Sequence, residues 1–330
     1  MAKTKAKPLV SVILCCYNCA SRLEKCLNSL ESQTYKELQY VLINDGSTDD
    51  TERFLLDFAK DKNAVYACYE NSGIATARNR GLSKVTGEYF TFIDADDIVS
   101  PIHIENLVES AEKYGAEVSV SGFIRLKDKK ASKYRFNLNK KAKVEEFSKV
   151  DAMKQYFSQN KFDYVLWNKL YKTETLRKTD ARFLDGSRYG EETLFIYEFF
   201  KGIKKAVYSP KITYIYVQNG QSLMHQEFSE KRLALYDNID KYIGDCKESY
   251  PEVYPYVCSM RSGYSCGMLF FMKRSGYKNA KVVKGVIDSL FADAKQLKKC
   301  KKTSLYRRLF ITQVPKVAKL LFKKLLKTKK

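Results

Sequence analysis

The sequence has few of the features that place a protein in a membrane or build a metal–thiolate site. No apolar stretch reaches the roughly 18–20 residues needed to cross a bilayer. The basic N-terminal residues are followed by an apolar run of only about seven residues, which favours a buried first strand over a signal peptide. The nine cysteines are accompanied by only two histidines, His103 and His225, which form no cluster at metal-ligand spacing. We therefore expect no structural zinc, reduced thiols and a cytoplasmic protein.

Positive charge is concentrated near the C-terminus. Of the net charge of +21, residues 271–330 contribute +17, because 19 Lys and Arg residues there are opposed only by Asp288 and Asp293. The final segment also has the spacing of an amphipathic helix, with lysines largely off an apolar face formed by Val317, Leu320, Leu321 and Leu325. This pattern is typical of a helix that lies on an anionic membrane. A helix docked on the body of the protein remains an alternative.

Strand-like and helix-like segments alternate through the first part of the chain. The β-branched or aromatic runs predict strands at residues 10–14, 38–44, 64–70, 88–94 and 117–123. Helical spacing between them indicates right-handed crossovers and a mostly parallel sheet with helices on both faces. Beyond about residue 226 the pattern is helical. We predict an α/β catalytic domain over residues 1–225 and a helical region over residues 226–330.

Polar clusters follow four of the predicted strands, at residues 17–18, 45–47, 71–73 and 94–97. In a parallel sheet, ligands bind at the carboxyl ends of the strands, so these clusters should share one rim. Asp94 and Asp96, separated by one residue, suit Mg²⁺ or Mn²⁺, which keeps positions for phosphate and water. Arg78 should reach the same rim and could pair with phosphate. Taken singly, Asp45 or Asp97 could instead be a helix cap or turn residue.

Five segments, in order, resemble the motifs of the family-2 inverting glycosyltransferases, which have the GT-A fold: VSVILCCYN, LINDGSTDDT, NSGIATARNRG, GEYFTFIDADD and YGEETLF. The resemblance covers about residues 8–222 and also includes WNKLYKTETL. It implies a GT-A domain, a nucleotide-diphosphate sugar donor and a divalent metal, Mn²⁺ or Mg²⁺. It also implies that Asp94-Ala95-Asp96 is the family's DxD signature, in which the first aspartate meets the donor ribose or metal and the second coordinates the metal.

The resemblance implies roles for the other rim residues. Cys15 and Tyr17 occupy the positions that pack the nucleotide base, and Asp45 matches the aspartate that bonds the base, commonly uracil. A UDP-sugar is therefore the expected donor. Four further positions are expected at the donor or acceptor side: Arg78 and Asn79 near the diphosphate, Trp167 toward the acceptor, and Lys169 toward phosphate. Trp167 could instead be a core anchor, and Lys169 could meet only water.

Inverting transfer needs a carboxylate that takes the proton of the acceptor hydroxyl. The family's ED motif reads Glu191-Glu192 here, so a glutamate replaces the expected aspartate. Glu192 is the expected base, with Glu191 as the alternative. The extra methylene shifts the carboxylate by about one ångström, and errors of that size can cost about a hundredfold in rate unless the pocket compensates. Two acids favourably placed near a helix N-terminus would give the same pattern without catalysis.

The sequence therefore predicts a metal-dependent glycosyltransferase of cell-surface polysaccharide synthesis. The expected acceptor is a saccharide or lipid-linked saccharide, at the inner face of the cytoplasmic membrane. A nucleic-acid-binding protein would explain the basic tail, but its positive charge lacks regular aromatic interleaving and the acidic rim would have no role. A glycoside hydrolase could use paired carboxylates, yet it would need neither the Asp-x-Asp pair nor the nucleotide-binding turns.

Overall fold

The computed structural model describes residues 6–137, 143–186, 190–218 and 228–297, together with Lys316, Ala318 to Leu320, Phe322 and Lys323. The chain divides into two compact units. The first comprises residues 1–152 and 161–222, and the second comprises residues 153–160 and 223–330. The second unit thus includes residues 153–160, which we had assigned to the catalytic domain. Within the described residues, no helix has the length and apolar character needed to cross a membrane.

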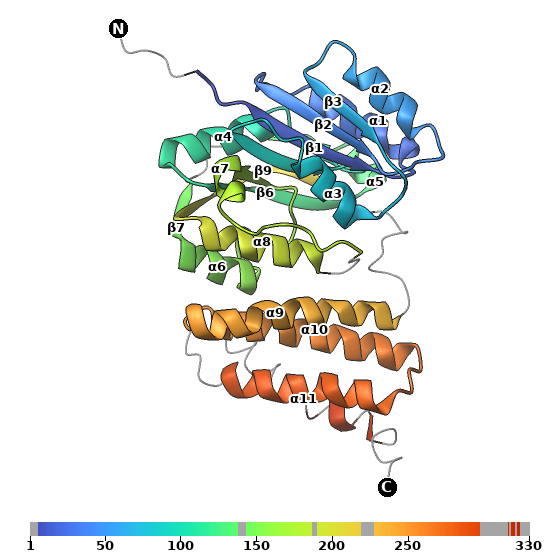
Figure 1. The fold of residues 1–330 in the computed structure, drawn as a ribbon, viewed down its shortest axis with the longest axis vertical. Coiled ribbons are helices and arrows are strands. Elements are labelled where there is room, and N and C mark those ends of the chain that lie inside the picture. The colour runs from blue at the N-terminus through green and yellow to red at the C-terminus, as the bar shows by residue number, and fades with distance from the viewer. Residues whose placement is uncertain are drawn as a thin grey trace. The chain divides into compact units, whose positions relative to one another are not determined.

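The first unit is built on one sheet (Figure 1). Its strand order is β3-β2-β1-β4-β8-β6-β9-β5, and β7 pairs with β9. Four neighbouring strands are parallel: β1 (Val10–Cys16), β2 (Leu38–Asn44), β3 (Ala64–Cys68) and β4 (Tyr89–Asp94). They coincide with the predicted strands to within a few residues at each end. The predicted α/β class with a mostly parallel sheet is confirmed.

The remaining strands arise from segments far apart in sequence. They are β5 (Ile98–Val99), β6 (Val118–Lys127), β7 (Glu145–Ser148), β8 (Lys169–Lys172) and β9 (Lys205–Gln218). Strand β8 is antiparallel to both β4 and β6, and it therefore separates the parallel set from the pair β6 and β9, which is itself parallel. Strands β5 and β7 are antiparallel to β9.

Helices cover both faces of this sheet, because alternate residues of a strand point to opposite faces. Val10, Val12 and Leu14 share a core cluster with α1 (Ala20–Glu31), α2 (Thr51–Ala59) and α4 (His103–Tyr114). On the other face, α3 (Ile74–Leu82) brings Gly81 so close to Ile13 that a Cβ there would lie 2.6 Å from the Ile13 methyl. The aromatic rings of β4 meet those of α8 (Glu191–Gly202) on that face. Three short helices complete the unit: α5 (Asp128–Ala131), α6 (Lys149–Ser158), which extends into the second unit, and α7 (Thr173–Arg177).

The second unit is helical, as predicted for the C-terminal region. A 3₁₀ turn (Glu230–Leu233) precedes α9 (Ala234–Ser249), α10 (Tyr254–Arg274) and α11 (Ala280–Leu297). Arg261 of α10 links all three long helices through 2.6 Å contacts with Asp240 of α9 and Asp293 of α11. Asp293 is only 1% exposed, so the guanidinium provides the charge that its burial requires.

Gly87, immediately before β4, provides a test of this packing. A Cβ at this position would lie 2.7 Å from the carbonyl oxygens of Leu9 and Tyr89 and 2.8 Å from the amide nitrogen of Ser11. Because backbone atoms cannot rotate away, we expect Gly87→Ala to destabilise the first unit by about 2–3 kcal/mol. Urea unfolding followed by the fluorescence of Trp167, the single tryptophan, measures this directly. Gly285→Ala in α11, where a Cβ meets no atom within 4 Å, should leave the Trp167 transition unchanged.

Candidate active site

The ends of the parallel strands form one polar rim, as predicted. The pairing register places Cys15 beside both Asp94 of β4 and Ile43 of β2, and Cys16 beside Asn44. The turns that leave β1, β2 and β4 therefore start at the same level of the sheet. Burial raises the pKa of the Cys15 thiol to about 12, so Cys15 is a neutral group at the base of this rim.

The turn after β1 is fastened to the turn after β2. The backbone N–H of Asp45 donates to the carbonyl of Cys16 (2.9 Å), and that of Asn18 donates to the Ser47 hydroxyl (3.0 Å). The Asn18 side-chain oxygen accepts from the N–H of Thr48 (2.8 Å). These bonds hold the backbone on both sides of Tyr17, whose side chain is left 53% exposed. A fixed backbone with an exposed ring is the arrangement that stacking on a nucleotide base requires.

Asp45 is almost fully buried, and its carboxylate is occupied by the chain itself. It accepts hydrogen bonds from the N–H of Gly73 (2.9 Å) and from the Ser72 hydroxyl (3.0 Å). It also lies 3.3 Å from Arg80, whose guanidinium stands over the ring of Tyr69. Asp45 thus fastens the segment after β3 to the rim. Sequence reasoning predicted a base contact for Asp45 but missed Arg80, which follows Arg78 in the same helix.

Arg78 lies at the centre of an ionic cluster. Its side chain is only 6% exposed, and its guanidinium lies 2.8 Å from Glu192, 3.5 Å from Glu191 and 3.7 Å from Asp94. The ring of Phe183 lies 5.5 Å away on one side. The structure therefore brings together four predicted site residues, which come from α3, β4 and the first turn of α8.

Three aspartates end β4 and have different surroundings. Asp97 is fully buried and accepts from the Tyr214 hydroxyl and from the N–H of Val217, both at 2.8 Å, so it ties this turn to β9. Asp94 and Asp96 keep side chains that are 33% exposed. Asp96 lies 3.8 Å from Arg22 of α1, a second arginine that sequence reasoning missed. The two partly exposed aspartates are the pair predicted to hold a metal.

Asp94 and Asp96 fit an oxygen-binding divalent cation that shares its ligands with a substrate. Among the described residues, no group of three or more His, Cys, Asp or Glu side chains could hold a metal ion alone. Mg²⁺-type sites in phosphate-transfer proteins use one or two carboxylates and complete their coordination with phosphate oxygens and water. Desolvation raises the pKa of Asp94 to about 7, and the charges of Glu192 and Asp96 add to that rise. An added cation would relieve this repulsion.

Glu191 and Glu192 differ in accessibility. Glu191 is buried, and its pKa is raised first by desolvation and then by the neighbouring charge of Glu192. Glu192 makes the shorter contact with Arg78, yet its side chain is 27% exposed. Both stand in the first turn of α8, where the helix dipole stabilises a carboxylate. Of the two, Glu192 is the one whose carboxylate reaches solvent more openly.

Two predicted ligand-binding residues, Trp167 and Lys169, lie inside the protein. Trp167 is 2% exposed and stacks on Tyr214 with ring centroids 4.1 Å apart, so the structure gives it the role of the core anchor. Lys169 is fully buried, and its ammonium donates to the carbonyls of Asp163 (2.9 Å) and Val165 (2.5 Å) and to the side-chain oxygen of Asn168 (2.8 Å). Burial lowers the pKa of Lys169 to about 7. With all three ammonium donors used, Lys169 holds the loop before β8 and has no donor left for a phosphate.

Asn79 likewise has a structural partner. Its side-chain amide donates to the carbonyl of Phe183 (2.8 Å) and accepts from the N–H of the same residue (2.9 Å). This reciprocal pair fastens α3 to the segment that precedes α8, which keeps Arg78 opposite Glu191 and Glu192. Asn79 therefore helps to position Arg78 within the ionic cluster through its hydrogen bonds with Phe183.

The predicted membrane-binding helix is described only in part. Val317, Leu321 and Leu325 lie outside the described residues. Ala318 and Phe322 are buried in a cluster with apolar residues of α10 and α11, so this segment packs on the second unit. Leu320, by contrast, is 68% exposed. The two buried residues agree with the docked alternative, and the membrane-binding role stays a prediction.

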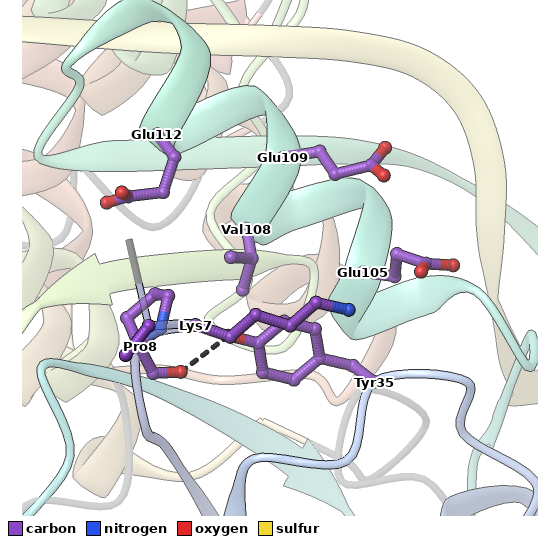
Figure 2. A pocket seen from close by; sticks show the side chains of 8 residues that line it. Lys7, Pro8, Tyr35, Glu105, Val108, Glu109 and Glu112 are labelled. Carbon is purple, nitrogen blue, oxygen red and sulfur yellow. Dashed lines mark hydrogen bonds between the residues drawn. The ribbon is translucent and has the colours of Figure 1, made fainter. Parts of the chain in front are cut away.

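A hollow of about 210 Å³ lies at the other end of β1, beside Pro8 and Tyr35 and below Val108 of α4 (Figure 2). The Tyr35 hydroxyl donates to the carbonyl of Pro8, which closes its floor. It is smaller than the roughly 300–1,000 Å³ of most ligand pockets. Because Pro8 precedes β1 while the rim follows it, the hollow is separate from the candidate active site.

Comparison with known proteins agrees with this geometry. The sequence pattern of Glycosyl transferase family 2 matches residues 11–179. Glycosyltransferase GlyA of Streptococcus pneumoniae is 30% identical over 212 residues, which are 63% of this chain and 30% of that protein. The uncharacterized glycosyltransferase EpsJ of Bacillus subtilis is 26% identical over 76% of this chain and 75% of its own length. This chain thus spans less than a third of GlyA and about three quarters of EpsJ.

A solved structure extends the likeness to the fold. Residues 1–349 of S. aureus TarS superpose with a TM-score of 0.71 at 15% identity, covering 97% of this chain and 91% of that one. At that identity the likeness concerns the fold. The family match, however, includes β1 to β4 and the Asp-x-Asp turn and spans half of the chain. The chain belongs to glycosyltransferase family 2 and has the GT-A fold.

Proposed function

We propose that this protein transfers a sugar, with inversion, from a UDP-sugar to a hydroxyl of a saccharide or lipid-linked saccharide in cell-surface polysaccharide synthesis. The observation that carries the proposal is the buried Arg78 among Asp94, Glu191 and Glu192, at the same rim as the exposed ring of Tyr17. TarS structures exist with UDP and with UDP-GlcNAc, which supports a uridine nucleotide. A nucleic-acid-binding role has no support from the family match.

In this proposal the donor nucleotide lies across the turns after β1 and β2. Tyr17 stacks on the base, and Asp45, with Cys15 below it, shapes the base pocket. The diphosphate lies toward Arg78, whose guanidinium is suited to paired phosphate oxygens. Arg22 and Arg80 add positive charge on either side of the rim.

Asp94 and Asp96 would hold the divalent cation, Mn²⁺ or Mg²⁺. When bound, the cation supplies charge neutralisation for the departing diphosphate. A mannosyltransferase from Pyrobaculum calidifontis, solved with GDP-Man and Mn²⁺, shares the fold at a TM-score of 0.50, which is consistent with such a site. Glu192 would accept the proton of the acceptor hydroxyl as that oxygen attacks the anomeric carbon from the side opposite the diphosphate.

The metal role is tested by Asp96→Asn. In the parent protein, UDP with Mn²⁺ should raise the melting temperature, because a ligand at a hundred times its Kd stabilises the folded state by about 2.7 kcal/mol. We expect Asp96→Asn to lose most of that rise, and release of UDP from a panel of UDP-sugars should fall in parallel. The matched control is Asp57→Asn, which changes the same charge at an exposed ion pair with Lys60. An undiminished Mn²⁺ effect in Asp96→Asn would remove Asp96 from the metal site.

The base is tested by Glu192→Gln. Removing a general base typically costs about 10²–10⁴-fold in rate, so kcat should fall by at least about a hundredfold while UDP binding persists. Glu198→Gln is the matched control, because Glu198 is on the same helix and pairs with Lys201 at 2.7 Å. If kcat is retained in Glu192→Gln but lost in Glu191→Gln, the base is Glu191.

The second unit offers a surface for peripheral membrane association, on the cytoplasmic side if the acceptor is lipid-linked. Between the last turn of α10 and the first turns of α11, five exposed cations occur with no acidic residue among them: Lys273, Arg274, Lys278, Lys281 and Lys284. Phe270, one turn earlier, is 63% exposed. Each such cation near an anionic leaflet contributes about 1 kcal/mol. Cations beside an exposed aromatic ring are the composition of an interfacial surface.

This surface is tested by co-sedimentation with phosphatidylglycerol vesicles. The triple variant Lys278→Glu, Lys281→Glu, Lys284→Glu should lose most binding in low salt, because each change reverses one attractive charge. The control reverses three exposed lysines of the first unit, Lys129, Lys130 and Lys133. Equal losses in both variants would indicate a response to net charge alone, and unchanged binding in the first would exclude this surface.

A further inference from the structure

Two cysteines flank the tyrosine of the rim, in the order Cys16-Tyr17-Asn18-Cys19. Cys16 is the last residue of β1, and Cys19 is the N-cap of α1. The two side chains are close enough for each thiol to shift the pKa of the other. Two cysteines with two residues between them, at the junction of a strand and a helix N-terminus, have the spacing and position of thiol pairs that form reversible disulfides.

The two thiols are unequal. Cys16 is buried, and its pKa is raised well above the usual range, chiefly by the hydrogen bond that it donates to Cys19. Cys19 is partly exposed, and its pKa is lowered because its sulfur accepts from Cys16 and from the Thr51 hydroxyl. The thiolate, which reacts with oxidants, therefore forms first at Cys19, where solvent can reach it. Cys16, the buried thiol of the pair, is placed in the same turn to act as the resolving thiol.

The same turn carries the bonds that hold the proposed base pocket. Cys16 accepts from Asp45 through its carbonyl, Asn18 bonds Ser47, and the N–H of Cys19 donates to the Thr51 hydroxyl at 2.9 Å. A covalent bond between the sulfurs draws the two ends of this turn together and moves Tyr17 and Asn18, which lie between them. Oxidation of the two thiols would therefore reach the wall of the proposed nucleotide site through these three hydrogen bonds.

We propose that Cys16 and Cys19 are an oxidative modification site, at which a peroxide converts the two thiols into a disulfide and weakens nucleotide binding. In the first step the Cys19 thiolate attacks hydrogen peroxide, which is reduced to hydroxide as Cys19 becomes a sulfenic acid. In the second step the Cys16 sulfur attacks the Cys19 sulfur, the S–S bond forms, and the sulfenic oxygen leaves with two protons as water. A thiol reductant reverses the change by exchange. The binding consequence rests on the proposed function, whereas the disulfide does not.

The disulfide is tested on the full chain. Reduced protein is treated with hydrogen peroxide, the remaining thiols are blocked with N-ethylmaleimide, and the peptide that contains Cys15, Cys16 and Cys19 is sequenced by mass spectrometry. We expect this peptide to lose two hydrogen atoms and to carry a single N-ethylmaleimide group, on Cys15. Cys16→Ser and Cys19→Ser should abolish the loss, whereas Cys15→Ser and Cys68→Ser, the latter at an exposed cysteine, should retain it. Trp167 fluorescence verifies that each variant is folded.

The consequence for binding is measured as the melting shift given by UDP with Mn²⁺. Oxidation should weaken UDP binding by on the order of tenfold, about 1.4 kcal/mol, and dithiothreitol should restore it. The oxidised Cys19→Ser variant should show no such loss. Full labelling of Cys16 and Cys19 after peroxide, or oxidation of Cys19 to sulfinic acid without a disulfide, would overturn the site. A disulfide that forms without changing UDP binding would overturn the coupling, and a reduced protein that does not bind UDP would instead overturn the proposed function.

Discussion

The structure of the candidate site depends on the burial of one charged side chain. Arg78 is 6% exposed, and moving a guanidinium out of water costs several kcal/mol unless carboxylates surround it. Its partners come from β4 and α8, which are separated by about a hundred residues of sequence. The reciprocal bonds between Asn79 and Phe183 hold α3 against the segment before α8. The substrate site that we propose at this rim would therefore take its geometry from the ion cluster around Arg78.

That cluster has more negative than positive charge. Arg78 is opposed by Asp94, Glu191 and Glu192, and Asp96 is close by with Arg22 as its neighbour. Together with desolvation, the crowding of carboxylates raises the pKa of both Asp94 and Glu191. A diphosphate would add further negative charge and compete with these carboxylates for the arginine. A divalent cation between the aspartates and the phosphates would remove both difficulties, which supports a metal-dependent donor site on physical grounds.

The sequence predicted the parallel strands and the rim because both follow from local patterns. Runs such as VSVIL and LQYVLIN identify buried strands, and parallel register then places the residues that follow them at one edge. It did not predict the burial of Lys169, because the acceptors that satisfy its ammonium belong to a loop whose conformation depends on β8. Trp167 could be read either way, since a tryptophan that stacks on a sugar and one that stacks on Tyr214 have the same local sequence. The antiparallel insertion of β8 between β4 and β6 is equally a long-range event. Sequence reasoning missed the pair Cys16 and Cys19, although only two residues separate them, and the link between their turn and the proposed base pocket depends on long-range hydrogen bonds.

The glutamate at position 192 is explained by its partner. Of the two candidates, Glu192 is both closer to Arg78, at 2.8 Å, and more exposed. Arg78 therefore holds one oxygen of the Glu192 carboxylate, while the carboxylate still reaches solvent. The ion pair limits the rotamers of the longer side chain, which offsets part of the entropy that a flexible base would lose on becoming ordered. An aspartate at this position would withdraw the carboxylate by about one ångström from the arginine, because it lacks one methylene. The longer side chain of Glu192, the base that we propose, thus reaches Arg78 at the position where the fold holds it. In this proposal, the departure from the family's ED motif is compensated within the same ion cluster.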